Sequence, residues 1–430
     1  MITRIEATRY RCLERLDTDL RSFGVLVGAN GAGKTTFLDI PGLLGDCLQQ
    51  REVGQAFTTR QHNRPPRSST LNELVFCGQG NEFILAIEIE LPEAIFTALL
   101  PFQSGPIQND ENRWLRFLRY EVRFEIFNER QLIVGNEYLF LFAPSTVPER
   151  DESKPGKARL FGEVAPHREW RSIIVRERDG KVSFRPEKQK NKKGKPAHVD
   201  ATTLALSKVQ FESADEFPAA RWLHDVLTKS CVFYHPDIDL LQTASPPGLS
   251  EGVMANAANL PWLVLELQKD AERFGPWVEH VKTALPQISG IRAKEREEDH
   301  HAYLAVTYNG GYEVTSSGLS EGTLRVMALT ILPYLEKRPT IIITEEPENG
   351  IHPQAIEAVL QSLGSVYDSQ VLISSHSPVV LAMSQLDQIL CSRMAPTGAV
   401  TIINGTDHPR LQEWKGSIDL GSLFAAGVLR

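Results

Sequence analysis

The strongest constraint on this chain is a glycine-rich stretch near its start, Gly28 to Thr35, which reads G-A-N-G-A-G-K-T. An apolar run, Phe23 to Val27, precedes it, and Thr35 to Leu38 begins a helical pattern after it. Strand, glycine turn and helix in this order leave free backbone N–H groups at a helix start, where they attract a phosphate. An accidental glycine turn would lack these flanking elements. We therefore interpret the stretch as the phosphate-binding loop of a nucleotide site.

Each position of this loop has a predicted role. The Lys34 ammonium is expected to reach the β- and γ-phosphates as a catalytic cation, and the Thr35 hydroxyl is expected to hold Mg²⁺. The backbone of the loop and of the first helical turn would surround the phosphates. The predicted nucleotide-binding residues are Asn30, Gly31, Ala32, Gly33, Lys34, Thr35 and Thr36.

The composition is that of an ordinary globular protein. Apolar residues make up 42% and charged residues 23% of the 430 residues, and the formal net charge is -8. A chain of this acidity is not a general nucleic-acid coat, although a local basic patch can still bind DNA or RNA. No run approaches the ~18 apolar residues that cross a bilayer. The five cysteines are widely spaced without a C-x-x-C pair, so we expect a cytoplasmic protein that does not contact membranes.

A second, acidic motif lies later in the chain, where Pro339 to Gly350 reads P-T-I-I-I-T-E-E-P-E-N-G. The β-branched run Ile341 to Ile343 is typical of a central parallel strand buried on both faces. Open α/β sheets bind ligands at the carboxyl ends of such strands. Glu345 would therefore hold Mg²⁺, and Glu346 would orient and activate the water that attacks the γ-phosphate. A solvent-exposed acidic turn is the alternative, and a phosphate loop in the same chain argues against it.

Two further segments fit the same site. Gln370 to Pro378 reads as a strand that ends in a polar turn with His376, which could hydrogen-bond the γ-phosphate; otherwise a lone histidine is a satisfied surface residue. Upstream, Gly318 to Thr323 precedes a helix that we expect to run to about Leu335. Ser320 is placed to cap that helix, whose first N–H groups form an anion site. Ser320 and Gly322 would contact the γ-phosphate of a nucleotide held by a second subunit.

The strand and helix signals divide the chain into four predicted parts. Residues 1–92 would form the N-terminal part of the nucleotide-binding head, 93–214 a β-rich insertion, 215–300 a helical lobe, and 301–430 the C-terminal part of the head. Two basic stretches have two interpretations each, a solvated loop or a contact with a nucleic-acid backbone. They are the loop 60–67 and the run 186–196, which has five lysines against one glutamate.

Together these motifs resemble those of the ABC-type ATPase heads in the SMC, RecF and OLD (overcoming lysogenisation defect) group. The match is to the stand-alone AAA/ABC ATPases of bacterial anti-phage defence operons. It covers residues 1–40 and 255–385 and is weak across the β-rich middle. The matching motifs are Walker A at Gly28 to Thr35, the signature at Leu319 to Thr323, Walker B at Ile341 to Glu346, the D-loop at Asn349 to Pro353, and the switch histidine His376.

The resemblance implies an α/β fold: an ABC-type P-loop NTPase head with a mixed β-sheet nucleotide lobe, an antiparallel β-rich insertion and a helical lobe. It implies an enzyme that hydrolyses ATP with Mg²⁺ and dimerises around two ATP molecules, or forms a higher oligomer. Each ATP would lie between one Walker A motif and the opposite signature. The sequence departs from the group at Glu345, where Walker B usually has aspartate, and at Glu321, where transporter signatures have glycine.

Three functions are compatible with this resemblance. The first is an ATPase that senses nucleic acid (DNA or RNA) or controls an effector protein encoded alongside it in anti-phage defence, for example a Toprim-like nuclease acting in trans. The alternatives are a slowly hydrolysing, nucleotide-gated scaffold that holds an effector, and a RecF-like DNA repair ATPase. The resemblance also implies a glutamine-loop residue, for which Gln55, Gln61 and Gln79 all qualify, and an arginine that reaches a phosphate, for which Arg11 qualifies.

Overall fold

Eight strands from the first half of the chain form one large sheet. It is seen in a computed structural model that describes residues 1–61, 64–146, 169–178, 180–189, 194–212, 215–249, 251–411 and 420–425. Within these ranges the chain forms two compact units. Unit 1 takes residues 1–21, 30–229 and 393–402, and unit 2 takes residues 22–29, 230–392 and 403–430. The chain therefore passes from unit 2 to unit 1 inside the glycine-rich loop.

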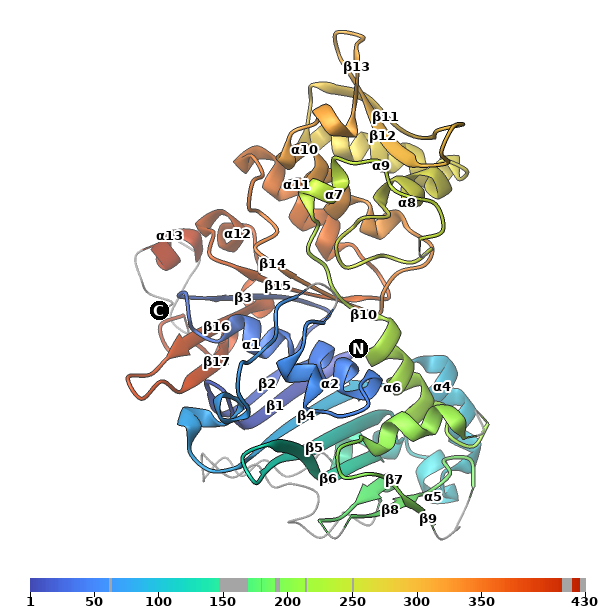
Figure 1. Ribbon diagram of the computed structural model, residues 1–430, viewed down its shortest axis with the longest axis vertical. Coiled ribbons are helices and arrows are strands. Elements are labelled where there is room, and N and C mark those ends of the chain that lie inside the picture. The colour runs from blue at the N-terminus through green and yellow to red at the C-terminus, as the bar shows by residue number, and fades with distance from the viewer. Residues whose placement is uncertain are drawn as a thin grey trace. The chain divides into compact units, whose positions relative to one another are not determined.

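Unit 1 is built on an antiparallel sheet with the strand order β2-β1-β4-β5-β6-β7-β8-β9 (Figure 1). Its strands are β1 (Ile2–Tyr10), β2 (Leu13–Asp19), β4 (Glu82–Glu90), β5 (Phe117–Phe127), β6 (Gln131–Phe142), β7 (Arg171–Arg176), β8 (Lys181–Phe184) and β9 (Lys195–His198). Its helices are α1 (Lys34–Leu38), α2 (Ile40–Gln49), α3 (Gln55–Thr58), α4 (Glu93–Leu99), α5 (Gly105–Gln108) and α6 (Pro218–Lys229). Successive side chains of a strand point to opposite faces, so the two faces of this sheet differ in character.

One face of this sheet carries an apolar core. Tyr10, Phe83 and Phe124 come from three neighbouring strands, and their ring centroids lie 5.2 Å (Tyr10–Phe83) and 5.0 Å (Phe83–Phe124) apart. Helices α2 and α6 pack against each other beside the sheet (Figure 1). They approach so closely that a Cβ added to Gly45 would lie 2.1 Å from the Leu227 carbonyl oxygen. Only glycine permits this helix contact.

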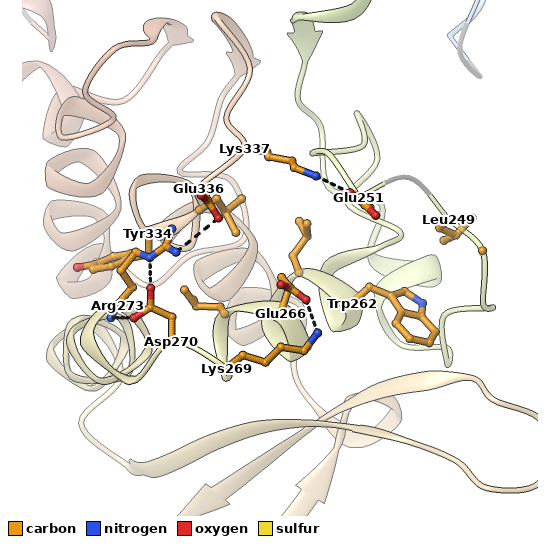
Figure 2. Close-up of a pocket in the computed structure, with 14 residues that line it drawn as sticks. Leu249, Glu251, Trp262, Glu266, Lys269, Asp270, Arg273, Tyr334, Glu336 and Lys337 are labelled. Carbon is orange, nitrogen blue, oxygen red and sulfur yellow. Dashed lines mark hydrogen bonds and ion pairs between the residues drawn. The ribbon is translucent and has the colours of Figure 1, made fainter.

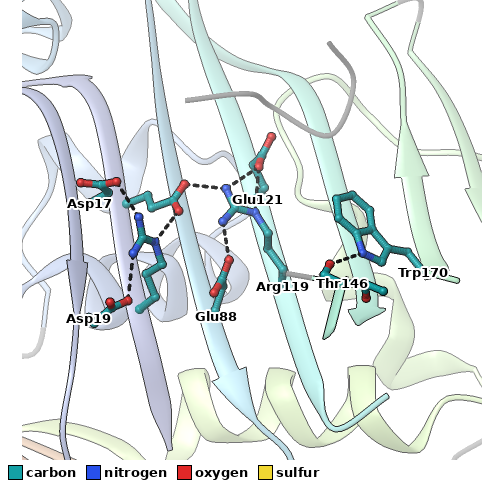
Figure 3. Close-up of polar contacts among 9 residues, drawn as sticks. Asp17, Asp19, Glu88, Arg119, Glu121, Thr146 and Trp170 are labelled. Atoms are coloured by element: carbon teal, nitrogen blue, oxygen red, sulfur yellow. Dashed lines mark hydrogen bonds and ion pairs between the residues drawn. The ribbon is translucent and has the colours of Figure 1, made fainter. Parts of the chain in front are cut away.

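The opposite face carries a network of buried charges (Figure 3). Arg4, Glu88 and Arg119 share this face because they stand opposite one another on β1, β4 and β5. The Arg119 guanidinium donates to Glu6 at 2.7 Å and to Glu88 and Glu121 at 2.8 Å each. Arg4 donates to Glu6 at 2.7 Å, and the two arginines are only 4% (Arg4) and 3% (Arg119) exposed. The network therefore ties the three strands together through ions that are largely buried.

The stability of unit 1 is expected to fall in acid because of Glu6. Burial acts to raise the pKa of Glu6, but Arg119 and Arg4 outweigh this effect and lower the pKa to about 2. The folded pKa thus lies below the ordinary value of 4.5, so the ionised carboxylate stabilises the fold above pH 4.5. This contribution is lost as the pH falls towards 2 and amounts to about 3 kcal/mol.

Urea unfolding between about pH 7 and pH 3 tests this expectation. The free energy of unfolding should decrease below pH 4.5, and Glu6→Gln, which cannot ionise, should show a smaller decrease. An identical pH dependence in both proteins would contradict the assignment to Glu6.

Unit 2 contains a parallel sheet whose central strands are apolar on both faces. Its strands are β10 (Cys231–Phe233), β14 (Ile341–Glu345), β15 (Gln370–Ser375), β3 (Phe23–Gly28) and β16 (Ile389–Met394), in this spatial order, and the chain then continues into β17 (Val400–Asn404). Neighbouring strands from β10 to β16 run parallel. Ile341, Ile342 and Ile343 of β14 are fully buried, as predicted for a central strand. The α/β fold class predicted from the sequence is confirmed.

A helical group and a small antiparallel sheet complete unit 2 (Figure 1). The helices are α7 (Ile238–Leu241), α8 (Leu260–Leu267), α9 (Ala271–Ala284), α10 (Glu321–Thr330), α11 (Pro353–Gly364), α12 (Pro378–Ala382) and α13 (Leu420–Ala425), and the strands are β11 (Ile288–Glu295), β12 (Ala302–Tyr308) and β13 (Glu313–Thr315). Three helices meet at Thr330 of α10. Its hydroxyl accepts the Trp277 indole N–H of α9 at 3.2 Å, and its carbonyl accepts the Ser362 hydroxyl of α11 at 3.0 Å.

Prolines set two of the helix boundaries. Pro41 stands in the first turn of α2, and α1 ends before it. The helix after the signature was expected to reach about Leu335, but α10 ends at Thr330. Pro333 explains the difference because it has no N–H to donate and its ring obstructs a continuing helix.

Other features had no sequence signal or stay predictions. Strand β10 was not expected, since three residues are too few for a periodic pattern. The division of the chain into four parts stays a prediction. Across the described ranges, no helix is both long and apolar enough to span a membrane.

Candidate nucleotide site

Strand β3 delivers the glycine-rich loop to the carboxyl edge of the parallel sheet in unit 2. β3 lies between β15 and β16, and its last residue, Gly28, stands opposite Ser392. A Cβ on Gly28 would lie 2.3 Å from the Ser392 carbonyl oxygen, so the loop can begin here only with glycine. Because β3, β15 and β14 are parallel, their carboxyl ends share one edge, where such sheets bind ligands.

The rest of the loop and helix α1 belong to unit 1. Gly31 and Gly33 have φ angles of 77° and 73°, which side chains rarely tolerate, and Gly33 directly precedes Lys34, the first residue of α1. A Cβ on Gly33 would lie 2.9 Å from the Cys12 Sγ. A left-handed turn at a helix start directs backbone N–H groups into a concave anion site. Lys34 and Thr35 therefore open the helix, as the Walker A interpretation requires.

Two acidic residues end strand β14 in unit 2. Glu345 is the last residue of the strand and stands opposite Ser374 of β15. Glu346 follows, and its N–H donates to the Ser374 carbonyl oxygen at 2.8 Å. Its φ of 45° is left-handed, which costs a glutamate about 1–3 kcal/mol and is typical of functional positions that their surroundings hold in place. Both acids stand at the ligand-binding edge of the sheet.

The Glu346 carboxylate contacts side chains of two neighbouring segments. His376, in the loop after β15, places its Nε2 3.4 Å from Glu346 Oε1. Asn349 donates its side-chain N–H to Glu346 Oε2. The side chains of His376 and Glu346 are 30% and 37% exposed, so a ligand can reach both. The sequence predicted Glu346 and His376 as separate site residues, and the structure brings them together.

The signature segment begins helix α10 of the same unit. Ser320 caps this helix, as predicted, and its Oγ accepts the Thr323 N–H at 3.3 Å. A Cβ on Gly322 would lie 2.6 Å from the Gly350 carbonyl oxygen. The start of the signature helix therefore packs directly on the D-loop, and this contact requires glycine.

The oxygen donors predicted for Mg²⁺ suit that ion. Thr35 offers a hydroxyl and Glu345 a carboxylate, and Mg²⁺ is commonly bound by one or two such protein oxygens together with substrate phosphates and water. In the part of the chain that the structure describes, no cluster of three or more His, Cys, Asp or Glu residues could hold a metal ion. The donor chemistry therefore fits Mg²⁺ bound together with a nucleotide.

Two of the three arginines of the basic loop 60–67, Arg64 and Arg67, form ion pairs inside unit 1. Arg64 lies 2.8 Å from Asp39, and Arg67 pairs with the same carboxylate. Arg67 also lies 2.7 Å from Asp46 and is 8% exposed. These two arginines hold the loop against the start and middle of α2 instead of facing solvent as a basic patch.

Two lysines of the run 186–196 are also near acids. Lys188 lies 3.8 Å from Asp215, and Lys195 lies 3.4 Å from Glu216. Residues 190–193, which include the other three lysines, lie outside the described residues. Contact of this run with nucleic acid stays a prediction.

The glutamine-loop residue and the phosphate-binding arginine also stay predictions. Gln61 is buried, and its side chain accepts from Gln50 at 3.0 Å and donates to the Gln55 carbonyl at 3.1 Å. Arg11 has a left-handed φ of 53°, and its N–H donates to the Leu74 carbonyl at 2.9 Å. These contacts do not select among the candidates.

Unit 2 also has a cavity of about 430 Å³, shown in Figure 2. It lies between α8, α9 and the segment after α10, and Trp262 and Tyr334 are among the residues that line it. Its charged residues pair among themselves, as Lys337 does with Glu251 and Arg273 with Asp270. The cavity contains none of the predicted site residues.

Sequence reasoning missed two residues beside Glu346. Glu348 is the third acid of the Walker B run, and its carboxylate accepts a hydrogen bond from the Ser375 hydroxyl. A third acid directly after a predicted catalytic pair was the available signal for Glu348. Ser375 had no signal of its own, because its partner is distant in the sequence.

Comparison with solved structures defines the class of fold. An SMC head crystallised with the C-winged helix domain of ScpA matches with a TM-score of 0.51 and 12% identity, over 94% of this chain and 97% of that chain. The SMC head of Pyrococcus furiosus with an extended coiled coil, bound to the C-terminal domain of ScpA, matches with a TM-score of 0.48 and 13% identity, over 94% of this chain and 95% of that chain. No curated protein matches this chain. The first match shows the fold: an α/β P-loop fold like that of SMC head ATPase domains.

The sequence also defines the family. Residues 23–382 match the family described as "AAA domain, putative AbiEii toxin, Type IV TA system". Because this match covers most of the 430 residues, the chain belongs to that family. The predicted resemblance to SMC-type heads and AAA domains is thereby confirmed at the level of family and fold.

Proposed function

We propose that this protein is an ATPase that binds ATP with Mg²⁺ and dimerises around the nucleotide. The observation that carries the proposal is the environment of Glu346. It follows the Walker B strand in a left-handed conformation, and its carboxylate lies beside His376 and accepts a hydrogen bond from Asn349. A carboxylate held this way at the ligand edge of a parallel sheet is suited to orient a water for attack on a phosphate.

The proposed reaction is transfer of the γ-phosphoryl group of ATP to water. Lys34 and the N–H groups of the glycine-rich loop bind the phosphates, and Mg²⁺, held by Thr35 and Glu345, would neutralise the charge that develops on them. Glu346 takes the proton of the attacking water as the new P–O bond forms and ADP departs. His376 hydrogen-bonds the γ-phosphate and reports its presence.

The second subunit completes the site in this proposal. Ser320 and Gly322 of one subunit contact the γ-phosphate bound by the Walker A motif of the other. Within unit 2 the signature helix packs on the D-loop, which begins three residues after Glu346, so a nucleotide bound at the signature could influence hydrolysis.

We extend the proposal to control of an effector protein in anti-phage defence. The family description names a toxin, and a structural neighbour is an SMC head bound to a protein domain, that of ScpA. Arg64, Arg67, Lys188 and Lys195 lie beside acids of unit 1, so these four cations are already paired within the protein. A slowly hydrolysing scaffold that holds the effector is the second candidate.

Lys34→Ala tests the nucleotide site. We expect the affinity for ATP to fall about 10- to 100-fold, because a charge-assisted contact with the phosphates is lost. Binding can be measured by calorimetry or by the ATP-dependent rise of the melting temperature. Lys229→Ala, a change of a lysine that is 70% exposed in the same unit, is the matched control and should bind ATP as the wild type does. Unchanged affinity in Lys34→Ala would contradict the proposed site.

A further inference from the structure

Glu348 is the third acid of the motif Pro339 to Gly350, after Glu345 and Glu346. It has no role in the reaction proposed above. One of its carboxylate oxygens accepts the hydroxyl hydrogen of Ser375, the last residue of β15. Ser375 is fully buried, so water does not compete for this bond. The other oxygen, Oε2, is buried. The backbone N–H groups of Glu348 itself and of His376 also interact with this carboxylate and act to lower its pKa. The carboxyl group of Glu348 therefore links the turn of Glu346 to the loop of His376.

Ser375 extends the contact into the loop that carries His376. The Ser375 Oγ also accepts the N–H of Ser377 at 2.9 Å. Ser377 in turn caps helix α12, since its Oγ accepts the Val379 N–H at 3.2 Å. His376 therefore lies between two serines whose positions are fixed by hydrogen bonds, and one of them is held by Glu348.

Glu348 belongs to the same turn as Glu346. The Asn349 N–H donates to the Glu346 carbonyl oxygen at 2.9 Å, which closes the turn. The next residue, Gly350, packs against Gly322 of the signature helix. A displacement of Glu348 would therefore move the turn that holds Glu346, and with it the D-loop against the signature.

We propose that Glu348 is a positioning residue: through its hydrogen bond with Ser375 it fixes the turn of Glu346 relative to the loop of His376. The proposal rests on the ATPase function proposed above. Correct placement of the reacting groups contributes much of an enzyme's rate enhancement, and a misplacement of ~1 Å can lower the rate about 100-fold. Burial raises the pKa of Glu348, and the hydrogen bond that its carboxylate accepts from Ser375 opposes this shift.

Three substitutions separate the hydrogen bond from the charge. Glu348→Gln keeps the length and an acceptor oxygen, Glu348→Asp keeps the charge but is one methylene too short, and Glu348→Ala removes both. We expect kcat to fall about 10- to 100-fold in the alanine and aspartate variants and to stay within about 3-fold of the wild type in the glutamine variant. The affinity for a non-hydrolysable ATP analogue should be unchanged in all three, because the residues that bind the phosphates are intact.

A double-mutant cycle tests whether Ser375 is the partner. Ser375→Ala should lower kcat at least as much as Glu348→Ala does, because it also removes the acceptor of the Ser377 N–H. The double variant should lose no more than the larger single loss, because both changes remove the same hydrogen bond between Glu348 and Ser375. Glu357→Ala, a change of an exposed glutamate on α11 in the same unit, is the matched control and should keep the wild-type kcat. Melting temperatures of all variants are recorded alongside.

The outcomes separate this inference from the function on which it rests. A wild-type protein that does not hydrolyse ATP would overturn the proposed function itself. If the wild type hydrolyses ATP but the glutamine variant loses as much kcat as the alanine variant, the hydrogen bond is not the cause and the positioning role is wrong. The positioning role would also be overturned if the losses of kcat in the Glu348 and Ser375 variants simply add in the double variant. A common fall of kcat, ATP affinity and melting temperature would overturn it as well, because that pattern marks a purely structural residue.

Discussion

Replacing Glu346 by glutamine is expected to lower kcat for ATP hydrolysis about 10²- to 10⁴-fold and to leave ATP bound. Glutamine has nearly the same size and still offers an acceptor to the Asn349 amide, but it cannot take a proton from the attacking water. The Walker A residues are unchanged by this substitution. Binding of ATP and its hydrolysis should therefore separate in this variant.

Two measurements on this variant give the answer: phosphate release at saturating ATP and Mg²⁺, and the mass in solution with and without ATP. We expect a monomer without nucleotide and a stable dimer with ATP, because slow hydrolysis preserves the bound state. Glu357→Gln, on the exposed face of α11, controls for a general loss of a glutamate. Wild-type turnover in Glu346→Gln would exclude Glu346 as the base, and an ATP-bound monomer would contradict dimerisation around the nucleotide.

The elements that carry the candidate site could be predicted because each has a local signal. Gly31 and Gly33 adopt left-handed backbone, which selects glycine at single positions. The run Ile341 to Ile343 is buried on both faces, which selects β-branched residues. Ser320 caps α10 with an oxygen that reaches a nearby N–H. Each of these signals needs only a few neighbouring residues, so the sequence contains it directly.

The contacts between these elements could not be predicted, because they depend on which strands become neighbours. Glu346 meets His376, and Glu348 meets Ser375, only since β14 and β15 lie side by side in the sheet. Charge patterns in the sequence do not predict which basic residues are exposed, because ion pairs also depend on contacts between distant segments. Arg67 looks like part of a basic patch in the sequence, but it is buried against Asp39, which lies 28 positions earlier in the chain.

Arg119→Met is expected to lower the free energy of unfolding by about 3–5 kcal/mol. Arg119 is nearly fully buried and donates to three carboxylates within 2.8 Å, those of Glu6, Glu88 and Glu121 (Figure 3). Methionine fills much of the same space without a charge, so the three acids would be left buried with less compensation. Urea unfolding at neutral pH measures the loss. Arg178→Met, at a 59% exposed arginine that pairs with Glu82 and Glu125, is the control and should lose less than about 1 kcal/mol.

The pH dependence of the same variant decides whether charge or packing causes the loss. In the wild type, burial acts to raise the pKa of Glu6, but Arg119 and Arg4 together outweigh it and lower the pKa to about 2. Without Arg119, only Arg4 opposes burial, so the folded pKa of Glu6 should lie closer to its ordinary value of 4.5. The decrease of stability below pH 4.5 should then be smaller than in the wild type, because the folded and unfolded pKa values differ less. An Arg119→Met protein that is destabilised but keeps the wild-type pH dependence would show that lost packing, and not uncompensated charge, is the cause.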